Sequence, residues 1–300
     1  MKNMRIPLLA ALGVAIIGIV FGSFFDLSIS TVIASPKNNF GLIISAIGPM
    51  IGFGAVAVMG GGFIAFAIKG QYHVALKVLF FVLAACCYGV AVYYPAGEWF
   101  GINGFYGAAP EWAGYFIVFL PEAAAVVGGY FLFKDIKNKN MWIVFCAIIV
   151  LLLIALLAVI PLLKGIMHRP RYRFISTTDA VKFHNWWEPC KEYETLKDLT
   201  DHDNFKSYPS GHTAEASILL VPVTFLPLAD EKFKKYQMPL FYGACGLVLL
   251  VAFARILAAA HFLSDVSTGA TIMLVLLVIA NEIIMRIKPL QLENQTPEKE

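Results

Sequence analysis

The run from Met141 to Leu163, MWIVFCAIIVLLLIALLAVIPLL, carries no charged side chain. At 1.5 Å of rise per residue, a helix of this length crosses a bilayer core of about 30 Å. Of the 300 residues, 59% are hydrophobic and 14% are charged, which is more apolar surface than a soluble domain can bury. The sequence therefore predicts an all-α, polytopic transmembrane helix bundle. We expect about eight spans, with six as the alternative count, the others lying at about 6–25, 41–68, 74–94, 114–133, 212–229, 239–258 and 264–285.

Lysine and arginine predict which side of the membrane each loop faces, because they are retained in the cytoplasm. The outer loops at 26–40 and 95–113 contain one such residue, Lys37. With eight spans and a cytoplasmic N-terminus, the following basic positions all fall inside: Lys2, Arg5, Lys69, Lys77 and the stretches 134–140, 230–235 and 286–288. We therefore expect a multi-pass protein of the cell membrane with both termini in the cytoplasm.

Charge and cysteine content exclude several classes of protein. The net charge of +3 is small and scattered, so no nucleic-acid partner is expected. Cys190 stands alone in a polar loop, and the other four cysteines fall in apolar runs, so no disulfide framework is indicated. Cys and His residues show no metal-type spacing. We therefore predict no metal and no cofactor.

The segment 164–211 breaks the charge rule, since it lies outside and yet is rich in lysine and arginine. Its acidic residues begin at Asp179, so KGIMHRPRYR (164–173) is purely basic where the chain leaves the membrane. This cluster indicates an anionic partner. The simpler interpretation is that it binds lipid headgroups.

Two further polar stretches fall at outer ends of spans, YPSGHT (208–213) and ARILAAAHFLSD (254–265). Arginine offers forked donors that fit phosphate oxygens, and a helix beginning at PSGH would supply N–H groups to an anion. The side chains expected to meet at the outer surface are Lys164, Arg171, His212, Arg255, His261 and Asp265.

The two histidines have complementary chemistry. His261 and Asp265 are four residues apart, so on a helix they share a face and the carboxylate can hold one ring nitrogen. The other nitrogen is then free to act as a nucleophile, and His212 is available as a general acid. Taken singly, each feature has a structural interpretation: PSGH as a turn and cap, His261–Asp265 as a structural pair, and Arg255 as an interfacial side chain. Their joint occurrence on one membrane face favours a catalytic site.

These stretches resemble the three signature motifs of the type 2 phosphatidic acid phosphatase superfamily, which includes lipid phosphate phosphatases and vanadium haloperoxidases. The family patterns KxxxxxxRP, PSGH and SRxxxxxHxxxD are similar to KGIMHRPR (164–171), PSGH (209–212) and RILAAAHFLSD (255–265). Arg171 has the family's spacing from Lys164, with Tyr172 in the proline position, and Arg169 remains a second-tier candidate. Ala254 replaces the usual serine before Arg255.

The resemblance implies a role for each matching residue. His261 would attack phosphorus and Asp265 would orient it, while His212 would protonate the leaving group. Lys164, Arg171 and Arg255, with Ser210 and Gly211, would bind the phosphate, and no metal is required.

The sequence as a whole therefore predicts an integral-membrane phosphatase. It would hydrolyse a lipid-linked phosphomonoester or an isoprenyl diphosphate at the outer face through a phosphohistidine. The alternatives are a lipid phosphotransferase using the same site and a non-catalytic, transporter-like protein that binds anions or lipids. Three regions are expected: helices without motif (1–113), a phosphatase-like core (114–288) with the long loop 164–211, and a disordered cytoplasmic tail (289–300). The role of Glu122, within an apolar run, and the oligomeric state stay open.

Overall fold

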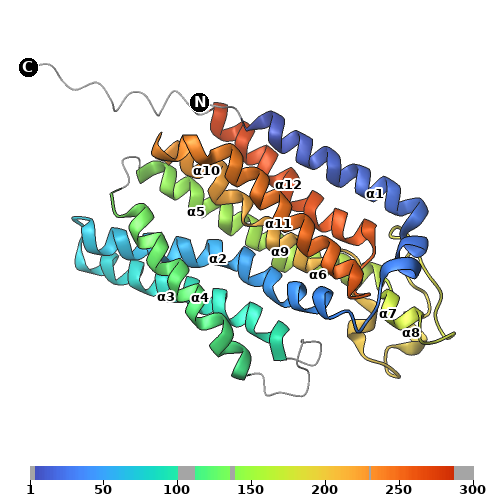
Figure 1. The fold of residues 1–300 in the computed structure, drawn as a ribbon. Helices are drawn as coiled ribbons and strands as arrows, with labels where there is room; N and C mark the ends of the chain where they lie inside the picture. The colour runs from blue at the N-terminus through green and yellow to red at the C-terminus, as the bar shows by residue number, and fades with distance from the viewer. Residues whose placement is uncertain (1–3, 101–111, 136–138, 230, 287–300) are drawn as a thin grey trace, which may run out of the picture.

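The computed structural model describes residues 4–100, 112–135, 139–229 and 231–286. The predicted all-helical class is confirmed, and seven helices in the described residues are long and apolar enough to cross a membrane. Figure 1 shows them as one bundle, with a larger segment that contains α7 and α8 at one end. The longer helices are α1 (Arg5–Ile33), α2 (Asn39–Lys69), α3 (Val74–Phe100), α4 (Trp112–Phe133), α5 (Lys139–Ile154), α11 (Gln237–Leu257) and α12 (Leu263–Arg286).

The sixth expected span, 212–229, is instead two short helices, α9 (Gly211–Ser217) and α10 (Leu220–Ala229). Proline at position 222 has no N–H and its ring crowds the carbonyl of Ile218, which favours a break in the helix one turn before the proline. The backbone tightens here, with Ile218 N–H donating to the Glu215 carbonyl and Val221 N–H to that of Ile218. Each piece alone is too short to span a bilayer.

The fifth span reaches the functional end of the bundle through an interrupted helix. After α5 comes a π-helical turn, η1 (Ala155–Val159), and then α6 (Ile160–Met167), with proline at its second position. A π turn widens the backbone, which accommodates a proline that a regular helix would exclude. The helix therefore continues beyond the predicted end of the span at Leu163 and carries Lys164 in its last turn.

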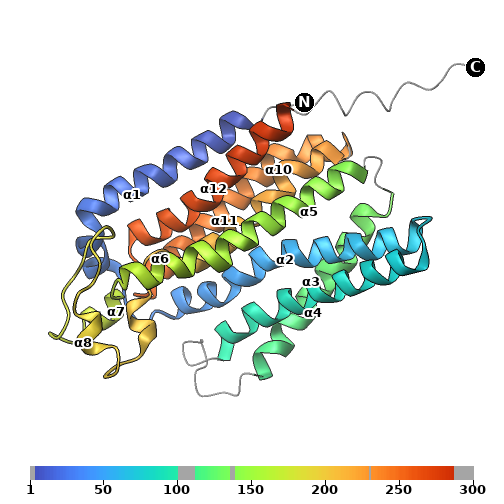
Figure 2. The same cartoon turned by 180° about the vertical axis from the view of Figure 1, so that it is seen from behind.

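Helix α2 lies between two groups of helices in the bundle. It packs on α3 and α4 on one side and on α9 and α11 on the other, as the reverse view in Figure 2 also shows. A Cβ added to Gly61 would lie 2.0 Å from the Val126 carbonyl oxygen, and one on Gly129 would lie 2.1 Å from that of Val58. In lipid the hydrophobic effect does not drive helices together, so van der Waals packing between closely approaching backbones stabilises their association.

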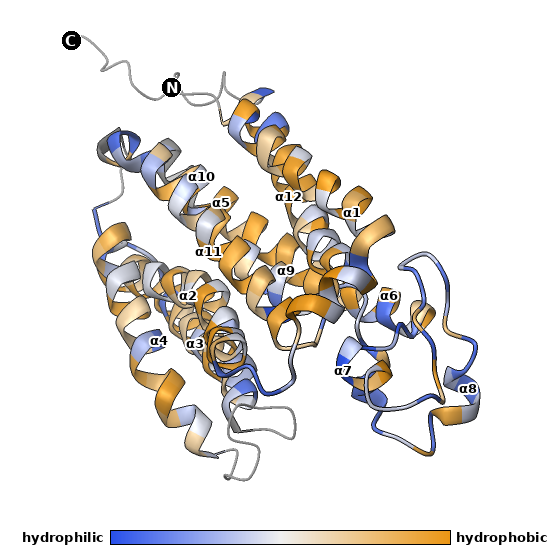
Figure 3. Cartoon of the chain, turned by 45° about the vertical axis from the view of Figure 1, so that its right-hand side comes forward, coloured by the Kyte–Doolittle hydropathy of each residue, from blue (hydrophilic) through white to orange (hydrophobic). Residues whose placement is uncertain are grey.

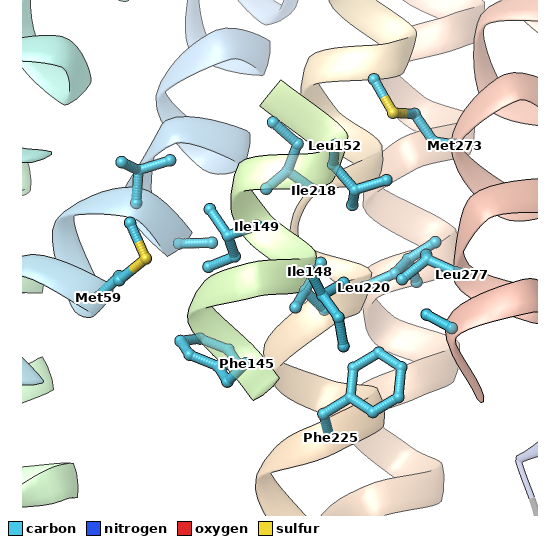
Figure 4. Packing of buried hydrophobic residues seen from close by; sticks show 14 of the residues in the cluster. Met59, Phe145, Ile148, Ile149, Leu152, Ile218, Leu220, Phe225, Met273 and Leu277 are labelled. Atoms are coloured by element: carbon cyan, nitrogen blue, oxygen red, sulfur yellow. The ribbon is translucent and has the colours of Figure 1, made fainter. Parts of the chain in front are cut away.

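The main apolar core lies between α2, α5, α10 and α12. Figure 4 shows Ile149 and Leu152 of α5 in this core, together with Ile218 and Met273. All four side chains are fully buried. This core fixes the helices whose ends carry the predicted site residues.

The segment after α6 is folded rather than an open loop. It contains α7 (Tyr172–Ile175), α8 (Tyr193–Leu196) and the 3-10 turn η2 (His202–Phe205). Val181, Cys190 and Phe205 form a small apolar cluster of their own. Figure 3 shows this polar region at one end of the apolar bundle. The predicted tail, 289–300, lies outside the described residues.

Candidate active site

The ends of α6, α9 and α11 meet at a cavity of about 190 Å³ beside the folded loop. Predicted residues from all three motif-like stretches line it: Lys164, Arg171, Gly211, His212, Arg255 and His261. Asp265, Ser210 and Arg169 lie behind these residues and are absent from the lining. A larger cavity of about 540 Å³ lies between α1 and α11, but its lining is almost wholly apolar and it contains none of the ionisable groups above.

His261 presents one defined nitrogen to the cavity. Its Nδ1 lies 2.5 Å from the main-chain carbonyl oxygen of Ser207. A carbonyl can only accept, so Nδ1 carries the proton and Nε2 of the neutral ring has a free lone pair. Burial, with Arg255 and Arg171 nearby, holds the pKa of His261 well below the ordinary 6.5. The ring is therefore neutral, as a nucleophile must be.

Asp265 lies beside the ring of His261, as expected, but it makes no direct hydrogen bond to the ring. The nearest carboxylate oxygen, Oδ2, is 3.9 Å from Nδ1, beyond hydrogen-bonding distance. Oδ2 instead accepts from the Ser207 hydroxyl at 2.5 Å and from the Phe262 N–H at 2.8 Å. Helix α12 begins at Leu263, so Asp265 lies in its first turn while His261 lies before it. Ser207 contacts both residues and links the acid to the imidazole. Asp265 therefore holds the loop that holds His261.

Arg169 belongs to a fully buried ion cluster, not to the cavity wall. Its guanidinium donates to Asp265 Oδ1 at 2.5 Å and to Asp26 Oδ2, on α1, at 2.9 Å. It also donates to the Ser264 hydroxyl at 2.8 Å and to the His184 carbonyl at 2.8 Å. Such a cluster locks α1, α12 and the folded loop together. The arginine of this motif that faces the cavity is Arg171.

Arg171 and Arg173 are held in place by one acid, Asp203. Arg171 Nη2 donates to Asp203 Oδ1 at 2.8 Å, and Arg173 Nη2 donates to Oδ2 at 2.6 Å. Burial alone would raise the pKa of Asp203, but the two guanidinium groups outweigh it and hold that pKa below its ordinary value. Arg173 and Asp203 also line the cavity.

A tight turn after α11 brings Arg255 and His261 to the same wall. The carbonyl of Arg255 accepts from the N–H groups of Ala260 and His261 at 3.1 and 3.3 Å. Ala259 adopts φ 56° to make the turn, a left-handed conformation that costs an alanine about 1–2 kcal/mol. Its carbonyl accepts from Arg173 N–H at 2.9 Å, which joins this turn to the basic loop.

Helix α9 is positioned by two glycines on its neighbours. A Cβ on Gly52 of α2 would lie 1.9 Å from the Glu215 carbonyl oxygen, and one on Gly269 of α12 would lie 2.3 Å from that of Ser210. Ser210 caps the helix, with its hydroxyl accepting from Thr213 N–H at 3.5 Å. Any side chain at either glycine would push the PSGH turn away from the cavity.

His212 faces a carboxylate that the sequence did not predict to be near it. Its Nε2 lies 3.0 Å from Oε2 of Glu98, near the end of α3, and its Nδ1 lies 3.9 Å from Oε2 of Glu215. Both acids line the cavity. The structure therefore places two carboxylates next to the His212 ring, on the same cavity wall.

Sequence reasoning missed five residues of this site: Glu98, Arg173, Ser207, Asp203 and Glu215. Glu215 and Arg173 lie within or next to the quoted motifs, so motif spacing gave a signal for them. Ser207 acts partly through its main chain, and Glu98 belongs to a helix far away in sequence. No pattern in one sequence could place those two beside His261 and His212.

The assembled groups suit phosphoryl transfer. The described cavity wall contains four cations, Lys164, Arg171, Arg173 and Arg255, which can neutralise a phosphate and the charge that develops on its oxygens. A neutral imidazole with a free Nε2 stands on the same wall as a second histidine paired with an acid.

Comparison with known proteins agrees with this geometry. The family model of the PAP2 superfamily matches residues 142–288, which contain all three motif-like stretches. No curated protein matches the chain significantly. No solved structure does so either. With seven candidate spans and this match, the protein is a membrane member of the PAP2 superfamily, whose domain occupies residues 142–288.

Proposed function

We propose that this protein is a phosphatase that hydrolyses a lipid-linked phosphomonoester or diphosphate at the outer membrane face. The observation that carries the proposal is the His261 ring, whose Nδ1 proton is bonded to the Ser207 carbonyl while Nε2 is left for the cationic cavity. PAP2 membership is consistent with lipid phosphate phosphatase activity.

The reaction would proceed in two displacements. His261 Nε2 attacks phosphorus, the bond from phosphorus to the leaving oxygen breaks, and His212 gives that oxygen its proton. Water then attacks the phosphohistidine, its proton passes to His212, and inorganic phosphate leaves. The two steps return both histidines to their starting states.

The electrostatic contribution would come from the four cations of the wall. Lys164, Arg171 and Arg255 approach the cavity from different elements, so they can contact different oxygens of one tetrahedral group. Phosphoryl transfer is accelerated mainly by such fixed charges and by positioning. In this scheme the cations stabilise the transition state, and the protein's own side chains suffice.

The distribution of basic residues supports an outer location for the site. Lys69 ends α2, Lys234 and Lys235 lie in η3 (Glu231–Tyr236), and Arg286 ends α12. These elements reach the end of the bundle opposite α7 and α8 (Figure 1). By the positive-inside rule that end is cytoplasmic, so the cavity opens on the other side.

The cavity fits a feature that several lipid phosphates have in common. Phosphatidate, phosphatidylglycerophosphate and undecaprenyl diphosphate all present a terminal phosphate on an apolar anchor. A phosphotransferase would use the same first step and pass the phosphoryl group to another acceptor. A non-catalytic anion-binding protein would use the cations alone.

One assay distinguishes these functions. Purified protein in detergent receives each of the three lipid phosphates without added divalent metal, beside His261→Ala and His212→Ala variants. We expect phosphate release by the wild type, and a loss of at least 10³-fold in His261→Ala, since removing a nucleophile removes the covalent route. Equal release by all three proteins would contradict the proposal. Phosphate found on an added acceptor, with little free, would identify a transferase.

Vanadate provides an independent check on the site. Its trigonal-bipyramidal form resembles the transition state of phosphoryl transfer, so it should inhibit competitively. A matched control is His202→Gln, because His202 contacts Tyr193 in the folded loop and is not part of the cavity wall. This variant should keep wild-type activity and vanadate sensitivity.

A further inference from the structure

A second group of reactive side chains lies in the folded loop, apart from the cavity. His184, Cys190 and Glu192 each offer one ligand atom, and the three atoms lie within 4.8 Å of one another. Cys190 is buried and the other two are half-buried. None of the three lines the candidate active site. We propose that they bind one zinc ion.

The contacts within the group are those of converging ligands. His184 Nε2 lies 3.0 Å from Glu192 Oε2, and yet this buried nitrogen makes no hydrogen bond of acceptable geometry. The Cys190 thiol lies 3.6 Å from the same carboxylate oxygen. The ring nitrogen and the sulfur thus approach one oxygen from different sides. A cation among the three atoms would satisfy the buried nitrogen that lacks a partner.

The donor set selects the metal. One thiolate, one imidazole and one carboxylate are the ligand types that zinc accepts, whereas calcium and magnesium prefer oxygen alone. Zinc sites with three protein ligands complete their tetrahedron with water. On binding, the Cys190 thiol loses its proton to solvent, and the zinc–sulfur bond takes its place.

The position of the group gives the ion a structural role. The His184 carbonyl accepts from Arg169 Nε at 2.8 Å, and Cys190 N–H donates to the Met167 carbonyl at 2.9 Å. Two of the three ligands are therefore fastened through their main chains to the end of the α6 stretch. Zinc would tie Glu192 to them and close the loop against Arg169, the residue that holds Asp265. It would stabilise the site from behind without contacting substrate.

Metal content and thermal stability test the proposal on the full-length protein. Protein purified in detergent without chelator is dialysed and its zinc measured by mass spectrometry, and zinc alone is titrated into chelator-treated protein. We expect one zinc per chain and a rise in melting temperature on adding it. Cys190→Ser, His184→Gln and Glu192→Gln should each bind zinc at least tenfold more weakly, since even outer partners of zinc ligands contribute 10–100-fold.

Matched controls come from the same loop. His202→Gln and Glu188→Gln change a histidine and an acid whose recorded contacts lie elsewhere, with Tyr193 and Asn185. Both should keep the zinc. Zinc retained by the three ligand variants, or lost equally from the controls, would overturn the proposal.

A measurement on the wild type alone covers the case in which a variant fails to fold. Cobalt added to chelator-treated protein should give the visible bands of a tetrahedral site and a thiolate-to-cobalt absorption. Absence of both, with less than a tenth of a zinc per chain, would overturn the assignment. The inference does not depend on the proposed activity, because zinc binding is read without substrate. A protein that hydrolyses lipid phosphates but does not bind zinc when it is titrated in would refute this inference alone.

Discussion

The imidazole Nδ1 of His261 lies 2.5 Å from the carbonyl oxygen of Ser207, whereas the nearest oxygen of Asp265 lies 3.9 Å away. Asp265 thus acts on His261 through Ser207, whose hydroxyl donates a hydrogen bond to Asp265 Oδ2 at 2.5 Å. Orientation of the nucleophile depends on a main-chain carbonyl that no side-chain substitution removes.

This arrangement predicts unequal effects of substituting Ser207 and Asp265. Ser207→Ala keeps the carbonyl and loses one hydroxyl hydrogen bond, so kcat should fall about fivefold, in line with a hydrogen bond worth about 1 kcal/mol. Asp265→Asn also breaks the buried pair with Arg169, and its unfolding free energy should fall by about 3–5 kcal/mol. Phosphate release and thermal unfolding in detergent measure the two effects. Equal kinetic loss in both variants, with unchanged stability, would contradict the indirect role.

Arg169 and Arg171 should separate stability from catalysis. Arg169 is fully buried between two carboxylates, so Arg169→Met should lower the unfolding free energy by about 3–5 kcal/mol. Arg171→Lys should remain folded while kcat/KM falls about 10–100-fold, because lysine lacks the planar fork that fits a phosphate. Melting curves beside kinetics of the two variants provide the measurement. The reverse pattern would show that Arg169 is the phosphate ligand.

Glu98 should matter for catalysis although it lies outside the matched domain. Its carboxylate is 3.0 Å from His212 Nε2, so Glu98→Gln removes the negative charge that faces the proposed general acid. We expect kcat to fall about 10–100-fold, because the acid loses the group beside it that holds it in place. Substrates with good leaving groups, such as p-nitrophenyl phosphate, need less help from an acid and should lose less. A variant with wild-type rates on both kinds of substrate would remove Glu98 from the site.

The depressed pKa of His261 predicts how stability depends on pH. The unfolded ring binds a proton near pH 6.5, but the buried ring does so only at a much lower pH. The unfolded state therefore takes up more protons below pH 6.5, and the folded protein loses up to about 1.4 kcal/mol per pH unit as the pH falls. His261→Asn should lack this part of the dependence. Denaturation of both proteins between pH 7 and 5 measures the difference, and parallel curves would contradict it.

Much of the architecture follows from sequence because long apolar runs permit little besides a spanning helix. The exception is 212–229, where Pro222 divides the expected span into α9 and α10. Composition could identify the run, but only the backbone constraint of proline shows that it breaks.

The site residues likewise fall into those that the sequence predicted and those that it did not. Membrane topology and motif spacing together predicted that Lys164, Arg171, His212, Arg255 and His261 meet, and all five line the cavity. That reasoning could not predict contacts between distant helices, because the approach of α3 to α9 depends on how α2 packs with both. The proposed zinc ligands were missed for a related reason: the loop folds three unevenly spaced residues together.

The central claim is that His261 becomes phosphorylated during turnover, and rapid quenching tests it most directly. His212→Ala is mixed with p-nitrophenyl phosphate, whose leaving group needs no acid, and the protein is quenched in base and mapped by mass spectrometry. We predict a burst of about one nitrophenol per site followed by slow turnover, with phosphate on the His261 peptide, because the second step lacks its base. Steady release of phosphate without a burst, or label on a residue other than His261, would contradict the account.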